Sequence, residues 1–183
     1  MPKLDTEADV LDELKRYDRL LDAVLDELKQ KGLEMPPAPV NEEGDPYVPQ
    51  WPAHITKLDD PKLFALHGEF EEFLRHIAGQ EVISRQEKRI AHEKTALVKA
   101  AIRKRSSGKN KEERDDSTTL DVLFQKMRQE ELYFTAFHNI HEAMQSIFDD
   151  DVSAISRQMT QREKALEHGR RGGGAAKRPW KPK

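Results

Sequence analysis

The chain has 183 residues, of which 36% are hydrophobic and 36% charged, and its formal net charge is −3. This composition is too polar for one large globular core and is typical of long amphipathic helices, which bury only a stripe of side chains. The absence of cysteine excludes disulfide bonds and thiolate metal sites. No segment approaches the ~18 apolar residues that a membrane span needs, and no apolar stretch follows Met1, so we expect a cytoplasmic protein without membrane contact.

Residues 1–31 are predicted to form an N-terminal amphipathic helix that ends at Gly32. Its apolar residues recur at alternating spacings of four and three, the heptad pattern of a coiled coil: Val10, Leu14, Tyr17, Leu21, Val24 and Leu28. The opposite face is acidic, with nine Asp and Glu against six Lys and Arg. We interpret the segment as a docking or oligomerisation helix and predict that Leu14, Leu21 and Leu28 bind the partner.

Residues 32–60 are predicted to form a proline-rich linker. Seven of the ten prolines lie between residues 36 and 61, and proline both removes a backbone donor and disfavours helix in the residue before it. Tyr47 and Trp51 are apolar anchors within this linker. They either pack the linker onto a neighbouring helix, which is the commoner outcome, or bind a partner.

Residues 61–167 are predicted to form a long antiparallel helical hairpin, so the expected fold class is all-α and coiled-coil-like. Two segments with helical apolar periodicity, 60–105 and 117–167, flank residues 106–116, which contain no apolar side chain and are expected to form a loop. The apolar stripe of the second segment is wider than a heptad seam, which indicates packing against further helices of this chain or of its copies. The glycine-rich tail, residues 168–183, is predicted to be disordered.

Basic residues gather in two blocks of the chain. Between Arg85 and Lys111 there are ten basic and two acidic residues, and the tail has six basic residues and no acidic one. Such blocks either neutralise nucleic-acid phosphates or simply form a solvated surface that keeps the protein soluble. Trp180, among lysines, is suited to stacking on a base. The predicted nucleic-acid-binding residues are Arg85, Lys88, Arg89, Lys94, Lys99, Arg103, Lys104, Arg105, Lys109, Arg170, Arg171, Lys177, Arg178 and Trp180.

No pattern in the sequence indicates an enzyme. Phosphate-binding loops, dinucleotide-binding glycine motifs and nucleophile elbows are missing. His138 and His141 lie one helical turn apart, but the Glu-x-x-His pattern of di-iron bundles is absent at both, so we expect no metal and no cofactor.

A family resemblance rests on the order of the segments from residue 60 to residue 165. A helix ends in the basic stretch 89–99 (RIAHEKTALVK) and residues 103–108, and a polar loop and a long aromatic-rich helix follow. This layout resembles the UvsY-like recombination mediators of T4-type phages, and it is also similar to small helical proteins of actinobacterial phages. The resemblance implies an oligomer that binds single-stranded DNA and helps to load a recombinase onto DNA coated by single-strand-binding protein. By match, the DNA contacts would be Lys88, Arg89, Lys94, Lys99, Arg103, Lys104 and Arg105.

The N-terminal helix, the proline-rich linker and the basic tail depart from that family's pattern and leave stoichiometry and partner choice open. The sequence therefore predicts a non-enzymatic, homo-oligomeric, single-stranded DNA-binding accessory protein, a recombination mediator that acts in the host cytoplasm if a phage encodes it. The alternative is a structural or scaffolding coiled-coil protein of a phage virion or assembly pathway. A third interpretation is a regulator that blocks a host protein through residues 5–31.

Overall fold

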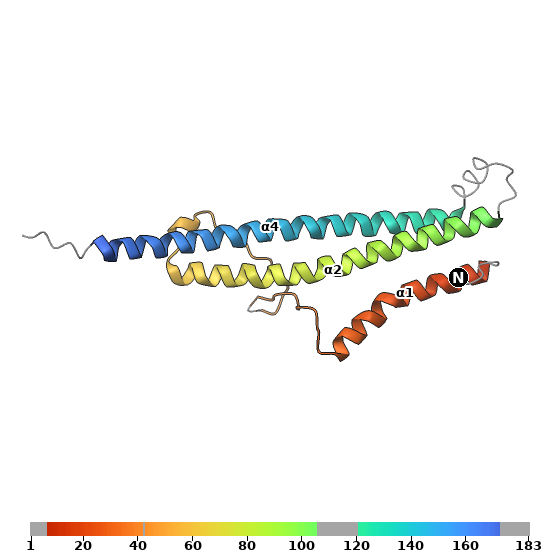
Figure 1. Ribbon diagram of the computed structural model, residues 1–183, viewed down its shortest axis with the longest axis horizontal. Coiled ribbons are helices and arrows are strands. Elements are labelled where there is room, and N and C mark those ends of the chain that lie inside the picture. The colour runs from red at the N-terminus through yellow and green to blue at the C-terminus, as the bar shows by residue number, and fades with distance from the viewer. Residues whose placement is uncertain (1–6, 42, 106–120, 173–183) are drawn as a thin grey trace, which may run out of the picture. The chain divides into compact units, whose positions relative to one another are not determined.

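The computed structural model describes residues 7–41, 43–105 and 121–172, and it confirms the predicted all-α fold. The elements in chain order are α1 (Glu7–Gln30), the short 3-10 helix η1 (Ile55–Lys57), α2 (Asp60–Arg105) and α4 (Val122–Gly172), labelled in Figure 1 where there is room. None of the helices in these ranges is both long enough and apolar enough to cross a membrane.

The chain divides into two compact units, which share α2 and α4. Unit 1 comprises Met1–Pro37 and His76–Gln145, and unit 2 comprises Ala38–Arg75 and Ser146–Lys183. Within each unit the two long helices lie side by side and antiparallel (Figure 1). In unit 1 the Thr95 hydroxyl donates to the carbonyl of Met127 at 3.1 Å, while in unit 2 His67 and Ser156 form a hydrogen bond of 2.8 Å. The predicted helical hairpin is confirmed.

Three of the helix ends have a cause in a nearby residue of the sequence. Asp59 caps α2 by accepting a hydrogen bond from the Lys62 amide at 2.9 Å, and this bond lowers the pKa of Asp59. Asp121 caps α4 by accepting from the amides of Leu123 and Phe124. Gly32, with a φ of 72°, ends α1 as predicted, because that left-handed conformation suits glycine.

Helix α4 continues beyond residue 167, where the hairpin was predicted to end. It runs to Gly172, so residues 168–172 of the predicted tail belong to the helix. The preceding residues 163–167 (EKALE) are strong helix formers, which favours propagation of the helix into the start of the tail.

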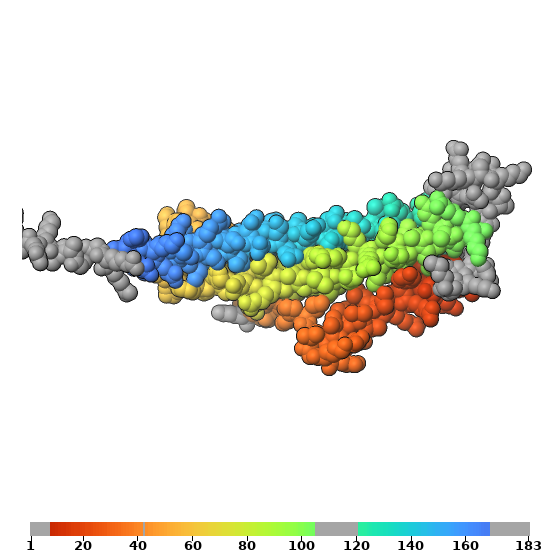
Figure 2. Space-filling view, viewed as in Figure 1, coloured from red at the N-terminus to blue at the C-terminus, as the bar shows by residue number. Residues whose placement is uncertain are grey.

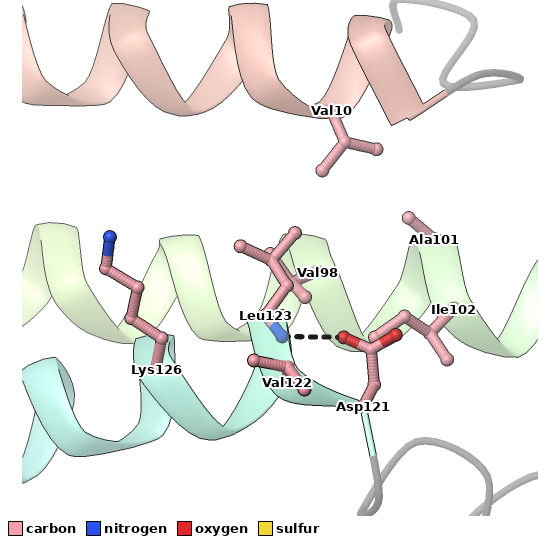
Figure 3. Close-up of a pocket in the computed structure, with 8 residues that line it drawn as sticks. All are labelled: Val10, Val98, Ala101, Ile102, Asp121, Val122, Leu123 and Lys126. Carbon is pink, nitrogen blue, oxygen red and sulfur yellow. Dashed lines mark hydrogen bonds between the residues drawn. The ribbon is translucent and has the colours of Figure 1, made fainter.

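The core of unit 1 joins α1 to the hairpin. Val10 and Leu14 of α1 pack with Val98 and Ala101 of α2 and with Met127 of α4, and all five are buried. Figure 2 shows α1, in red, against the green part of α2. In Figure 3 the side chain of Val10 points toward α2 across a cavity of about 430 Å³.

The core of unit 2 is aromatic. Phe148 of α4 lies with its ring centroid 4.5 Å from that of Phe73 and 5.6 Å from that of Phe70. Trp51 of the linker meets Phe70 edge-on at 5.9 Å, and the Tyr47 hydroxyl donates to Glu69 at 3.2 Å. Both linker anchors therefore contact α2, as the commoner of their two interpretations predicted.

The linker lies against α2 at Gly79 in unit 1. A Cβ atom there would lie 3.3 Å from Pro36 Cδ and 3.5 Å from Met35 Sδ. One turn earlier, His76 Nδ1 lies 2.9 Å from the carbonyl oxygen of Pro36, which only accepts, so the imidazole donates. These contacts fix the linker beyond the end of α1.

Candidate nucleic-acid interface

The basic half of α2, defined here as Arg85–Arg105, carries three cations with no ion pair in the part of the chain that the structure describes. These are Lys88, Arg89 and Lys99. Arg89 is exposed, while Lys88 and Lys99 are half-buried. Long basic side chains pack their aliphatic stems against a neighbour while the charged end reaches water, so all three can meet an anion.

Four side chains of the basic half of α2 line a shallow cavity of about 310 Å³ in unit 1. The α2 side contributes Arg85, Lys88, Arg89 and His92, and the α4 side contributes Glu131, Thr135 and His138. The guanidinium of Arg85 binds Glu81 through both carboxylate oxygens at 2.7–2.8 Å, yet 62% of the side chain is exposed. The cavity therefore gathers cationic groups on an open surface, which is the arrangement that attracts phosphates.

Lys94 differs from these cations because the chain's own acids enclose it. Its side chain is only 7% exposed, and its ammonium donates to Asp18 of α1 at 2.7 Å and to Glu130 of α4. Burial lowers the pKa of Lys94, but the hydrogen bonds and charges of Asp18 and Glu130 outweigh burial, so the pKa is raised overall. In this conformation Lys94 cannot contact a phosphate.

The remaining predicted nucleic-acid contacts fall into two groups. Arg103 and Lys104 each take part in an interaction within the chain. The structure does not describe the side chains of Arg105, Arg170 and Arg171, and Lys109, Lys177, Arg178 and Trp180 lie outside the described residues.

A buried polar layer between α2 and α4 was not predicted from the sequence. Glu81, Ser84 and His138 are all buried, with His138 Nδ1 3.4 Å from Ser84 Oγ and 3.6 Å from Glu81 Oε1. The one signal for it is the interruption of the apolar seam around Gln80. Among the described residues, no group of three His, Asp or Glu side chains could hold a metal ion.

The predicted partner-binding leucines of α1 occupy different environments. Leu14 is buried in the core of unit 1, so this chain already covers its side chain. Leu21 and Leu28 are half-buried, and Leu21 lines a cavity of about 350 Å³ between α1 and α2.

Helix α4 carries an exposed apolar line, named here the α4 seam, formed by Tyr133, Phe137, Ile140 and Met144. Tyr133 and Ile140 are more than half exposed, Phe137 is 38% exposed and Met144 is half-buried. The rings of Tyr133 and Phe137 stack nearly parallel, with centroids 5.9 Å apart. Their spacing of four, three and four residues is that of a heptad seam, and no helix in the described ranges covers it.

The surface features of unit 1 thus comprise an open basic cavity, an enclosed lysine and an exposed apolar seam. Their chemistry suits binding of polyanions and of helices. Comparisons of the chain with protein-family models, with curated proteins and with solved structures find no match.

Proposed function

We propose that the chain is a non-enzymatic, oligomeric accessory protein that binds single-stranded DNA and acts as a recombination mediator. The proposed partners are single-stranded DNA, a recombinase and single-strand-binding protein. The proposal places this activity in the cytoplasm, which is the host cytoplasm if a phage encodes the chain.

The observation that carries the proposal is the set of unpaired cations on α2. Lys88, Arg89 and Lys99 have no ion pair among the described residues, although the net charge of the whole chain is −3. Unpaired cations on an acidic protein are available to phosphates, and each phosphate contact releases condensed counterions. Contacts of this kind read no base sequence, which suits a protein that loads another onto any single strand.

The α4 seam supports the oligomeric part of the proposal. Exposed apolar side chains at heptad spacing pair with a second helix in coiled coils. An oligomer presents several copies of the basic half of α2 to one strand, which raises the overall affinity far above that of a single weak contact.

Fluorescence anisotropy with a labelled oligothymidylate tests the proposal. The variant Lys88→Ala/Arg89→Ala/Lys99→Ala should bind at least about tenfold more weakly than the wild type at low salt, because three phosphate contacts are lost. The matched control, Lys57→Ala/Lys62→Ala/Arg75→Ala, removes the same charge from exposed positions outside the basic half of α2 and should lose much less. Equal losses of affinity in the two triple variants would show that binding depends only on the net charge of the protein, and this result would contradict the proposal.

A scaffolding role is the second candidate, and the α4 seam is the observation that favours it. A structural coiled-coil protein needs an exposed heptad surface but no unpaired cations. Retention of the chain on capsid or tail proteins, together with no binding of oligothymidylate at about 0.15 M salt, would select this role.

A further inference from the structure

Among the described residues, the buried contacts and the ion pair that join α1 to α2 lie in the first half of α1. Val10 and Leu14 are buried in the core of unit 1, and Asp18 binds Lys94. Within the described part of the chain, no hydrogen bond or ion pair joins residues 19–30 of α1 to α2. The second half of α1 is therefore held weakly.

A partly open cavity between the two helices confirms the loose contact in that half. It has a volume of about 350 Å³, and its walls are Tyr17, Leu20, Leu21 and Val24 of α1 and Gln86, Arg89, Ile90 and Glu93 of α2. Leu20 is 51% exposed and Val24 46% exposed, so apolar surface on α1 stays in contact with water. Apolar surface left open in this way contributes little to holding α1 in place.

Helix α1 and the basic half of α2 carry opposite charge overall, and among the described residues Asp18 and Lys94 form an ion pair between them. Helix α1 carries eight acidic and four basic residues, whereas the basic half of α2 carries eight basic and two acidic residues. Asp18 binds the most deeply buried cation of that half, Lys94, whose ammonium also binds Glu130 of α4. The acidic helix is thus a competitor of any polyanion for this face of α2.

We propose that α1 is a displaceable cover of the basic half of α2, and that single-stranded nucleic acid releases it to reach Lys94. This inference rests on the proposed function. Release leaves α1 tethered, because the contacts of Met35 and Pro36 with Gly79 and His76 fix the chain just beyond the end of the helix. Released α1 would present its apolar heptad residues to a protein partner at the moment when the nucleic acid is bound.

Two pairs of variants of the full chain test the proposal that α1 covers the basic half of α2. Asp18→Asn removes the contact with Lys94, and its control Asp12→Asn removes the same charge from an exposed residue that, in the described part of the chain, pairs with Lys15 of its own helix. Leu14→Gln loosens the anchor of α1 without a change of charge, and its control Leu11→Gln alters a leucine that is 41% exposed. Circular dichroism establishes that each variant keeps the helical content of the wild type.

Asp18→Asn and Leu14→Gln should each bind labelled oligothymidylate about threefold to tenfold more tightly than their controls. The slopes of their plots of log affinity against log salt should match those of their controls, because α1 is displaced in every complex and the phosphate contacts are then the same. Hydrogen exchange in the wild type should show faster exchange of the α1 amides once the oligonucleotide is bound.

Two results would contradict the proposal that α1 is a displaceable cover. Equal affinities of the two variants and their controls, or α1 amides that stay protected in the complex, would mean that α1 remains in place while the protein binds. Absence of binding in the wild type and in every variant is a different result, since it would remove the proposed function and this inference with it.

Discussion

Lys94 and Lys99 lie on the same helix, five residues apart, yet their surroundings give them different roles. Lys94 is enclosed by Asp18 and Glu130, whereas Lys99 has no ion pair in the described ranges. Removing one member of a buried ion pair leaves the other members without a partner, while removing an unpaired surface cation changes little in the folded state. The contribution of each lysine to stability should therefore differ.

Lys94→Ala should lower the free energy of unfolding by about 2 kcal/mol, which is less than for a fully buried pair because Asp18 is largely exposed. Lys99→Ala is the matched control and should change it by at most about 0.5 kcal/mol. Urea denaturation followed by circular dichroism measures both. Equal effects of the two substitutions would contradict the enclosed environment of Lys94.

The carboxyl group of Glu131 allows a second test at the scale of single residues, in which stability is measured as a function of pH. Burial raises the pKa of Glu131, but hydrogen bonds from His92 and Arg128 outweigh burial, so the pKa lies below the ordinary value of 4.5. A carboxylate with a lowered pKa stabilises the fold above its unfolded-state pKa, and this contribution is lost as the pH falls through the folded-state pKa.

Glu131→Gln should therefore be less stable than the wild type near pH 7 by about 1 kcal/mol, and the difference should shrink as the pH falls through the folded-state pKa of Glu131. Urea denaturation at a series of pH values gives the two curves. A difference that stays constant across this range would show that the ionised form of Glu131 does not contribute.

At the scale of the elements, the aromatic core of unit 2 holds α2 against α4. Phe70 is only 1% exposed and contacts both Trp51 and Phe148, whereas Phe64 of the same helix is 58% exposed. Removal of a buried aromatic ring loses its transfer free energy and leaves a cavity.

Phe70→Ala should lower the free energy of unfolding by about 3–5 kcal/mol, and the control Phe64→Ala should lower it by well under about 1 kcal/mol. Thermal denaturation followed by circular dichroism compares them. If Phe64→Ala were the more damaging change, the assignment of the inward face of α2 would be incorrect.

The sequence predicted the elements better than the faces that they bury. Heptad spacing, helical apolar periodicity and Gly32 were enough for α1 and the hairpin, because they act within a few residues along the chain. The apolar stripe of α4 was not resolved into faces: Met127 and Phe148 are buried, whereas Phe137 and Ile140 are exposed. A wide stripe holds two heptad lines, and spacing alone does not say which one faces α2.

The candidate site was predictable as a charge pattern but not as a set of available groups. The basic half of α2 stands out in the sequence, yet the enclosure of Lys94 depends on Asp18 of α1, which lies 76 residues away from it along the chain. The distinction between Lys94 and its unpaired neighbours is therefore a tertiary property, and no local pattern carries it.

At the scale of the whole molecule, the α4 seam should decide how copies of the chain associate. Tyr133→Glu/Phe137→Glu places charge on the seam and should shift the protein toward a smaller species in size-exclusion chromatography with light scattering. The control Asn139→Glu adds charge at an exposed position of α4 outside the seam and should leave the mass unchanged. A wild-type protein that is already monomeric, or a double variant of unchanged mass, would exclude the seam as the contact between copies.

The measurement that most directly tests phosphate binding by the basic half of α2 is the salt dependence of oligothymidylate affinity. For the wild type, log affinity should fall linearly with log salt, and Lys88→Ala/Arg89→Ala/Lys99→Ala should reduce the magnitude of that slope by about 2, or about 0.7 for each lost contact. A slope that is the same in the wild type and in this variant would contradict the account, because the three cations would then not touch the phosphates.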